Sequence, residues 1–558
     1  MDARRTVLTL VFVVSLFLLW EAWMKQGASQ APTTANQPDL SQSANKASAS
    51  AGGVPSPSVA LDKLAPPSGG AAAAGQAPGD SASKTGARVV LRNTDLALEI
   101  DTQGARLVGA VLLNQPSSNY EGGRVRLFDT RPGQEFEAQT GLVGQGAQGK
   151  AFPNHTQAFF AVPLKSGQDA QRTVVLASES GGVKLMKTIS LDPSGFKVHV
   201  SHTVLNTGAD PVNPSLYLQL MRSGNPPPGE SQFYQTFTGP ALYTDQKKFQ
   251  KVGFSDIEKG RQDHVKQAPD GWIGLIQHYF VSAWILSNQA PREFFTRRLG
   301  NNLYSAGLIQ ALPEVSPGAQ QTHEALLYVG PQVQRTLEGL APGLELVVDY
   351  SWLTFIAKPI YWSLEQLHAL VGNWGWAIVL LTIIIKALFY PLSAASYKSM
   401  AKMKAVAPRM TALKERYGDD KAKFNQAMME LYKNEKINPL GGCLPVLVQI
   451  PVFLALYWVL LASVEMRDAP WVLWITDLAA PDPYYILPVI MAATMFLQTK
   501  LNPAPPDPIQ AKVMLFMPLV FSVFFFFFPA GLVLYWLVNN VVSIAQQWVI
   551  MKRVNGVT

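Results

Sequence analysis

The sequence contains one cysteine, Cys443, in 558 residues. An internal disulfide framework is therefore excluded, and any large domain has to rely on its hydrophobic core, for which the chain is long enough. No nucleophile motif, phosphate-binding loop or paired-carboxylate signature is present. The formal net charge of +7 is modest, and the basic residues cluster beside apolar segments, which argues against a nucleic-acid groove. These absences leave no candidate for a catalytic centre.

Histidines are few in the N-terminal part, and none has the spacing of metal ligands. We expect them to be scattered surface or loop residues. His199 and His202 are the closest pair, but three residues along a strand place them on opposite faces. The residues concerned are His155, His199, His202, His264, His278 and His323. We predict no metal and no cofactor.

Long apolar runs are concentrated in the last two hundred residues, whereas the first half is rich in small and polar residues. Residues 25–86 are Ala, Ser, Gly, Pro and Gln of low complexity, typical of a flexible tether. From Ala87 onward apolar and polar residues alternate, as in Leu96–Asp101 and Phe196–Ser201. Alternation with period two, punctuated by turn residues, predicts antiparallel strands with one wet face. We interpret 87–342 as one all-β sandwich-like domain outside the inner membrane.

The N-terminus combines basic Arg4 and Arg5 with an apolar stretch, Thr6–Trp23. The length of the run and the bulky and charged residues after it favour an uncleaved signal anchor over a cleaved signal peptide. Gly27-Ala28-Ser29 could still serve as a cleavage site.

Five further runs approach the ~20 residues that a hydrocarbon core requires. They cover about Trp374–Pro391, Val446–Ser463, Tyr485–Lys500, Val513–Phe528 and Leu532–Ile550. Five such runs with Trp and Tyr at their ends are typical of a membrane protein and untypical of a soluble core.

Loop charges indicate the orientation. The loop Pro391–Leu440 holds ten Lys/Arg against five acids, whereas Val464–Pro483 holds Arg467 against four acids. The positive-inside rule places the first loop in the cytoplasm and the second outside. Six spans with both termini in the cytoplasm satisfy every loop.

Two helical segments flank the second span. Ser351–Leu370 has apolar residues four apart among polar ones, which predicts an amphipathic helix on the outer membrane face; a core helix of the β domain is the alternative. In the basic loop, apolar residues spaced three and four apart on both sides of Gly418 predict a helical hairpin. It is either a solvated loop or a contact for a ribosome, a nascent chain or anionic lipid. Its basic residues include Lys402, Lys404, Arg409, Lys414 and Arg416.

Polar residues at membrane depth are the main candidates for a site. Placing a charged side chain near the bilayer centre costs about 2.5–3.5 kcal/mol. The presence of Lys386 within the apolar segment "TIIIKALFYPL" therefore requires an explanation. Lys386 shares a helix face with Thr382, and Gln449 lies early in the third span. The last span carries a polar stripe of Tyr535, Asn539, Ser543 and Gln546. Such stripes favour an aqueous cavity open to the cytoplasm, although the lysine stem could instead reach the interface by snorkelling.

A cavity with one cation could serve as a transporter site, a proton relay or a landing place for polypeptide. A proton relay would require buried carboxylates or histidines, and the central parts of the five C-terminal apolar runs contain neither. An internal repeat, the usual mark of secondary transporters, is not evident. An ion or solute transporter with a periplasmic binding domain stays the alternative function.

Four segments carry a family resemblance: "NWGWAIVLLTIIIKALFYPLSAASYKSMAKM", "NPLGGCLPVLVQIPVFLALYWVL", "DPYYILPVIMAATMF" and "FPAGLVLYWLVNNVVSIAQQ". The C-terminal part, from about 350 to 550, resembles the YidC membrane-protein insertases of Gram-negative bacteria, which are related to the Oxa-type proteins. The resemblance implies an insertase and chaperone that is not an enzyme and acts alone or with the Sec translocon. It implies a six-span α-helical membrane protein, with a five-helix core plus an N-terminal anchor, and a periplasmic all-β supersandwich domain.

The resemblance also implies a hydrophilic groove open to the cytoplasm and to lipid. Lys386 falls where the family usually carries arginine; it keeps the charge but lacks the bidentate fork. Thr382, Gln449 and Tyr535 match groove or client-contact positions, and Phe524 and Phe525 lie on the path by which a client leaves. The implied partners are nascent membrane proteins, the Sec translocon, the ribosome and membrane lipids, with no nucleic acid beyond ribosomal RNA.

The predicted organisation follows from these arguments. The segments are an anchor (1–24), a tether (25–86), a β domain (87–342), an interfacial helix (343–372), the second span (373–391), a cytoplasmic hairpin (392–440) and the remaining spans (441–554).

Overall fold

The computed structural model describes residues 54–55, 86–117, 119–146, 149–164, 167, 169–230, 236–350, 353–417, 420–435, 444–502 and 508–555. The predicted anchor at 1–24 lies outside the described residues. The same holds for the predicted tether at 25–86, except for Val54, Pro55 and Gly86.

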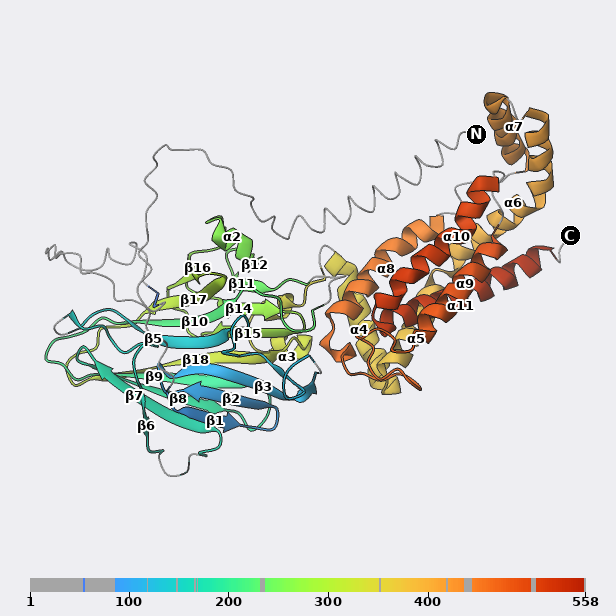
Figure 1. The fold of residues 1–558 in the computed structure, drawn as a ribbon. Helices are drawn as coiled ribbons and strands as arrows, with labels where there is room; N and C mark the ends of the chain where they lie inside the picture. The colour runs from blue at the N-terminus through green and yellow to red at the C-terminus, as the bar shows by residue number, and fades with distance from the viewer. Residues whose placement is uncertain are drawn as a thin grey trace.

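Residues 88–331 form two nine-stranded sheets in the described part of the chain, and every described strand pair is antiparallel (Figure 1). The first sheet contains β1 (Arg88–Arg92), β2 (Leu96–Asp101), β3 (Arg106–Pro116), β4 (Arg124–Arg126), β5 (Phe136–Val143), β10 (Ser215–Ser223), β13 (Gln267–Ala268), β16 (Arg292–Gly300) and β17 (Leu303–Ala311). The second contains β6 (Phe160–Val162), β7 (Thr173–Ser180), β8 (Val183–Leu191), β9 (Lys197–Asn206), β11 (Gly239–Thr244), β12 (Lys248–Lys251), β14 (Trp272–Gln277), β15 (Phe280–Ile285) and β18 (Gln320–Pro331).

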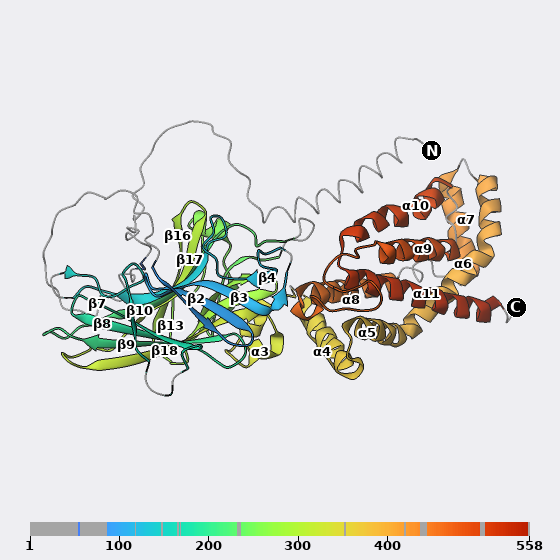
Figure 2. The ribbon, with the colours of Figure 1, turned by 60° about the horizontal axis from the view of Figure 1, so that its bottom comes forward.

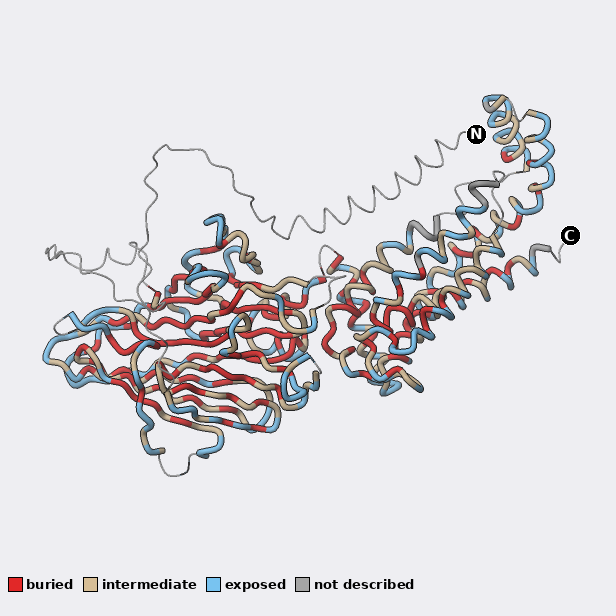
Figure 3. The backbone as a smooth tube through the Cα atoms, in the orientation of Figure 1, coloured by how far each residue is buried: buried red, intermediate tan, exposed pale blue. Residues whose placement is uncertain are grey.

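The alternation that predicts strands also determines which side chains fill the space between the sheets. In β8 every second residue is buried, from Val183 to Leu191. Leu96, Leu98 and Ile100 of β2 are likewise fully buried in the same cluster. Figure 3 shows buried backbone running through the middle of both sheets. The prediction of a β-rich domain is therefore confirmed.

The histidine prediction is partly wrong. His155, His202 and His264 are buried, and each has a hydrogen-bond partner inside the domain. His199 and His202 do lie on opposite faces of β9, with His199 exposed beside Asp192. Among the described residues, no three His, Cys, Asp or Glu side chains come close enough to hold a metal ion.

A buried lysine connects the two sheets. Lys187 of β8 is fully buried, and its Nζ donates to the carbonyl oxygens of Gly104 (2.9 Å) and Thr140 (2.8 Å). It also lies 4.5 Å from the centroid of the Phe159 ring. Directly opposite it in the ladder, His202 Nε2 lies 2.9 Å from Thr140 Oγ1. Two of the three N–H groups of Lys187 are thus bonded to backbone carbonyls, and no carboxylate among the described residues pairs with it.

The C-terminal part is helical. Its elements are α4 (Thr354–Val371), α5 (Trp374–Leu388), α6 (Tyr390–Tyr417), α7 (Lys421–Asn434), α8 (Leu444–Ala462), η6 (Val464–Met466), α9 (Ile486–Leu501), α10 (Pro508–Phe524), η7 (Phe525–Phe527) and α11 (Ala530–Asn555). Figures 1 and 2 both show α4 next to the β domain and α6 and α7 at the remote end of the helices.

No described helix alone has both the length and the apolar character needed to cross a membrane. The pair α5 and α6 passes that test together, across a bend of 66°. Large apolar side chains are nevertheless exposed on several helices, as a lipid-facing surface requires. They include Trp376, Ile384, Val489, Phe516, Val520 and Val523. The six-span arrangement stays a prediction.

The β domain and the helices share one hydrophobic cluster. It runs from Trp272 and Tyr328 in the sheet, through the short helices α3 (Gln334–Glu338) and η3 (Leu344–Val347), to Ile360 of α4. Because α4 buries one face against α5 and α8 while Phe355, Trp362 and Leu370 stay exposed, it is not a core helix of the β domain.

Polar contacts reinforce this junction. Arg467 Nη2 donates to the Pro116 carbonyl (2.6 Å), and His278 Nε2 lies 3.0 Å from the Leu461 carbonyl. Burial lowers the pKa of His278 to about 4, so the ring is neutral and can donate this bond at neutral pH. Arg335 pairs with Glu365 of α4 at 2.6 Å. Arg467, the one basic residue of its loop, thus ties the helices to the β domain.

The basic loop contains two helices that pack through their apolar stripes. Val406 and Met410 of α6 and Tyr432 of α7 form a small buried cluster, with Met403, Met428 and Leu431 around it. The Asp420 side chain accepts the backbone N–H of Lys423 and caps α7. Unlike the predicted first arm, α6 begins at Tyr390, directly after α5.

Lys187 generates a test of the β domain. Burial lowers its pKa to about 7, whereas an exposed lysine in the unfolded chain titrates near 10.5. Between these values the unfolded state binds more protons, so stability rises with pH, by at most about 1.4 kcal/mol per pH unit. We expect Lys187→Met to remove this component from the pH dependence of urea unfolding, followed by circular dichroism in detergent between pH 7 and 10. Lys184→Met, on the other face of β8, is the control; identical slopes in all three proteins would contradict the assignment.

Candidate functional site

Lys386 occupies a polar layer between three helices. It is only 6% exposed, and its Nζ donates to Ser543 Oγ of α11 (2.8 Å) and Gln449 Oε1 of α8 (3.2 Å). In the part of the chain that the structure describes, no carboxylate pairs with it. The side chain therefore does not simply extend to the surface; its charge is held by neutral oxygens.

The acceptors are themselves held in place. The Gln449 amide donates to Asn539 Oδ1, which fixes its oxygen toward the ammonium group. Ser543 Oγ donates to the Asn539 carbonyl (2.6 Å), so its lone pairs are available to Lys386. Gln546 Nε2 donates to the Lys386 carbonyl at 3.3 Å. The polar stripe predicted on the last span thus faces the lysine, because its steps of four, four and three follow one face of a helix.

An aromatic layer lies one helical turn from this polar layer, on the side of the β domain. Phe453 follows Gln449 by one turn of α8, and Tyr535 precedes Asn539 by one turn of α11. Their rings stack at 6.0 Å, and Phe453 also meets the edge of Trp536 at 4.4 Å. The N-terminus of α11 and the C-terminus of α8 both point to the β domain (Figure 2). These three aromatic residues therefore line the cavity at that end.

A cavity of about 270 Å³ lies beside the polar layer. Five predicted residues line it: Lys386, Gln449, Tyr535, Asn539 and Ser543. Ile450, which is 47% exposed, borders it as well, so the cavity adjoins the outer surface of α8.

The sequence interpretation missed part of the lining. The additional polar residues are Ser393, Ser396 and Tyr397 on α6, Gln498 on α9, and Asn502 directly after α9. Ser393, Ser396, Tyr397 and Met400 follow the i, i+3, i+4, i+7 pattern of one helix face, and this signal was available. The predicted second span ends at Pro391 with the basic loop beyond it, so the prediction does not include this face.

Four predicted residues do not line the cavity, and one of them is Gln546, which instead bonds to the Lys386 carbonyl. The Thr382 hydroxyl donates to the Ile378 carbonyl (2.7 Å) within its own helix. Phe525 is buried and packs against Trp536 at 5.2 Å, so it supports the lining from behind. Phe524 is 39% exposed near the end of α10.

The basic residues of the hairpin form a second group, away from the cavity. Lys402, Lys404, Arg409 and Arg416 are exposed on α6, and Lys414 is half-buried. Arg409 pairs with Glu435 beyond α7 at 2.5 Å. Most of this positive charge therefore faces outward from the packed stripe.

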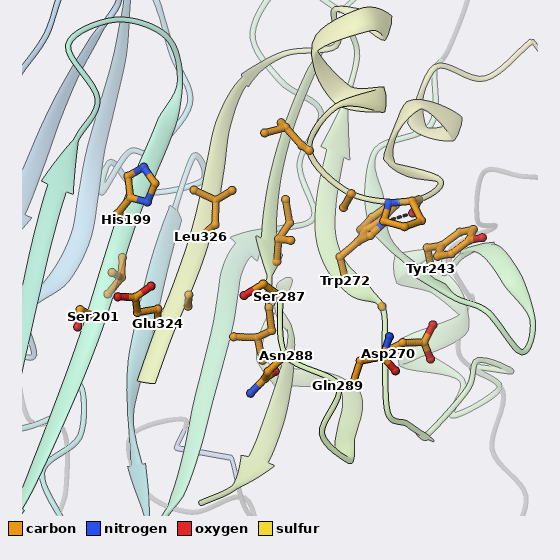
Figure 4. Close-up of a pocket in the computed structure, with 18 of the residues that line it drawn as sticks. His199, Ser201, Tyr243, Asp270, Trp272, Ser287, Asn288, Gln289, Glu324 and Leu326 are labelled. Atoms are coloured by element: carbon orange, nitrogen blue, oxygen red, sulfur yellow. Dashed lines mark hydrogen bonds between the residues drawn. The ribbon is translucent and has the colours of Figure 1, made fainter. Parts of the chain in front are cut away.

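A larger cavity, of about 730 Å³, lies in the β domain (Figure 4). His199, Ser201 and Glu324 come from neighbouring strands on one side, and Trp272 and Tyr243 lie on the other. Trp272 Nε1 donates to the Pro342 carbonyl at 3.1 Å, so its polar edge is already satisfied. His199 pairs with Asp192 at 3.0 Å. This arrangement presents no nucleophile with an adjacent base among the labelled residues.

Comparison with protein families covers most of the chain. The family described as "60Kd inner membrane protein" matches residues 366–556, and the family described as "YidC periplasmic domain" matches residues 88–363.

Individual relatives match over the full length. A protein of Bordetella pertussis named "Membrane protein insertase YidC" is 52% identical, over 99% of this chain and 98% of its own. A protein of the same name from Janthinobacterium sp. is 50% identical, over 99% of both chains. Among solved structures, one described as an active YidC insertase with its first transmembrane domain resolved covers 84% of this chain and 92% of its own, at 19% identity and a TM-score of 0.39.

The lysine contacts generate a test of whether Lys386 stabilises the fold. Lys386→Met removes the charge together with its desolvation cost, so the melting temperature in detergent should stay constant or rise. Gln449→Leu leaves the charge with one acceptor fewer, and loss of a hydrogen bond to a charged group costs about 1.5–3 kcal/mol. We therefore expect a lower melting temperature for Gln449→Leu, measured by tryptophan fluorescence. Lys500→Met, at the exposed end of α9, is the control; equal losses for Lys386→Met and Gln449→Leu would make the lysine a structural residue.

Proposed function

The chain belongs to the YidC family of membrane protein insertases, and on this basis we propose that the cavity beside Lys386 is the place where a client polypeptide enters the membrane. The protein is a membrane protein insertase of the inner membrane, with a β-rich periplasmic domain, and it is not an enzyme. Client membrane proteins are its partners.

One observation carries the proposal. Lys386 is a buried cation whose described contacts are neutral oxygens, at 2.8 and 3.2 Å. A cation already neutralised by a carboxylate would attract a client's acid only weakly, whereas this charge is still available. Acidic residues in the short extracytoplasmic part of a client would be drawn toward it.

The cavity lowers the desolvation cost of that polar segment. Amide and hydroxyl groups from four helices line it, so water or client backbone can be hydrogen-bonded there. The aromatic layer of Phe453, Tyr535 and Trp536 stops water from continuing toward the β domain. The client's apolar segment would then leave into lipid along the exposed surfaces of α8 and α10, where Ile450 and Phe524 lie.

The presence of lysine at position 386 suggests that the insertion step depends on electrostatic attraction and not on a fixed hydrogen-bond geometry. The ammonium group is a compact charge on a flexible stem and lacks the planar fork of arginine. The two neutral acceptors hold it without a bidentate pair. We infer that a point charge is sufficient for the step.

The proposed topology has six spans, with both termini in the cytoplasm. The loop that holds Arg467 contacts the periplasmic β domain, whereas α6 and α7 lie at the opposite end of the helices (Figure 1). The basic hairpin would then face the cytoplasm, where a ribosome with its emerging chain, or anionic lipid, could bind its exposed lysines and arginines. Cooperation with the Sec translocon belongs to the same proposal.

Crosslinking distinguishes an insertase from an ion or solute transporter. Met400 and Ile450 both line the cavity, and photo-crosslinking groups there should capture a ribosome-bound nascent membrane protein. Ile384, on the outward face of α5 and 52% exposed, is the matched control and should capture lipid. Protection of both cavity positions by a small solute, without capture of any nascent chain, would favour the transporter.

Charge variants of Lys386 test the attraction. In cells depleted of the wild-type protein, we expect Lys386→Arg to insert a client with an acidic periplasmic segment normally. We expect Lys386→Glu to slow insertion at least fivefold, equivalent to about 1 kcal/mol. Insertion is measured by protease access to the translocated segment, and a client whose acids are replaced by Asn and Gln is the control. Unchanged insertion of the acidic client by Lys386→Ala would remove the cation from the mechanism.

A further inference from the structure

The outer face of the first sheet carries a small apolar cluster. In β10 and β17, Leu218 and Leu308 point between the sheets, so their neighbours Tyr217 and Ile309 point to the other face. Tyr217 and Ile309 are directly opposite in the ladder, and Phe295 of β16 completes a cluster with them. We call Tyr217, Ile309 and Phe295 the socket. Strands β5, β10, β17 and β16, which surround it, lie side by side in Figure 1.

The Tyr217 side chain of the socket is held in position by its neighbours Gly141 and His155. Gly141 of β5 is opposite Tyr217, and a Cβ atom at that glycine would come within 2.7 Å of Tyr217 Oη. The backbone N–H of His155 donates to Tyr217 Oη at 3.1 Å, and the His155 ring meets the tyrosine edge-on at 5.7 Å. The tyrosine ring is therefore fixed on both sides.

The socket is covered although it lies on the outside of the sheet. Tyr217 and Ile309 are 0% exposed and Phe295 is 6% exposed. Val54 packs against this cluster together with Val143, and Pro55 beside it is buried. Val54 and Pro55 are the described residues of the predicted tether that precede Gly86.

The two residues suit such a site chemically. Proline has no backbone N–H, so its burial leaves no donor unsatisfied, and valine is apolar and stiff. Large aliphatic residues are rare in the tether, and four of its five fall between positions 54 and 64. They are Leu40, Val54, Val59, Leu61 and Leu64.

We propose that Val54-Pro55 is an internal docking motif that pins the tether to the socket of its own β domain. The tether then has a fixed point about 30 residues after the predicted anchor, where an unpinned tether would be fixed only after about 60. At about 3.5 Å per residue, the maximal reach between anchor and domain falls from about 200 to about 100 Å. Docking therefore restricts where the first span can lie relative to the β domain.

Disulfide formation tests the docking. In a Cys443→Ser background, Val54→Cys is paired with Val143→Cys, and oxidation in membrane vesicles is followed by gel mobility. The control pair is Ala74→Cys with Val143→Cys. Ala74 is closer in sequence to Gly86 than Val54 is, so an unpinned tether would crosslink position 74 at least as fast as position 54. We expect position 54 to react at least about tenfold faster. Equal rates, or faster reaction at position 74, would overturn the proposal.

Two further measurements identify the occupant. Size-tagged copies that each carry one cysteine of the pair should give no mixed crosslink; predominant mixed crosslinks would assign the socket to a second copy and overturn intramolecular docking. Val54→Asp combined with Pro55→Ser should speed maleimide labelling of Val143→Cys severalfold, whereas Leu40→Asp should not. Unchanged labelling would also contradict the proposal. Neither result depends on insertion activity.

Discussion

A single ammonium group sets the requirements for the helices around it. Lys386 is almost completely buried, and a charge in that position needs oxygen ligands, which α8 supplies through Gln449 and α11 through Ser543. Gln449 is oriented in turn by Asn539. Because these acceptors are neutral, the positive charge is solvated without being cancelled. In the proposed function, the same contacts that make the lysine tolerable leave it able to attract an acidic segment.

The surroundings of the polar layer differ on its two sides. Toward the β domain, Phe453, Tyr535 and Trp536 form a packed aromatic layer. Away from it, α6 and α9 contribute serine, tyrosine and amide side chains to the cavity. An insertion site of the proposed kind needs this asymmetry, since a polar cavity open at both ends would be a pore.

The β domain is held to the helices by a shared hydrophobic cluster and by a few polar contacts. Arg467 is one of the residues that make these polar contacts. In the sequence it is the one basic residue of an acidic loop, and one basic residue is compatible with an outside location under the positive-inside rule. In the structure its guanidinium group donates to the Pro116 carbonyl of β3. The proposed pinning of Val54-Pro55 would fix the tether to the outer face of the first sheet. The β domain then acts as a positioned body beside the helices, with the anchor restricted in its reach.

The sequence by itself determined those features of the structure that depend on local periodicity, namely the strands and the faces of the helices. Alternation predicted the strands, because a strand has period two, and the steps of three and four predicted the polar face of α11 and the hairpin stripe, because a helix has period 3.6. Long apolar runs predicted the membrane part, and family motifs identified the insertase family, whereas the orientation from loop charges stays a prediction. Only the tertiary structure decided which partners these faces meet. That His155 and His202 are buried, that Thr382 bonds to its own helix, and that α6 and α9 complete the cavity depends on contacts between residues far apart in the chain. Periodicity along one segment shows which side chains share a face, but it carries no information on which other segment packs against that face.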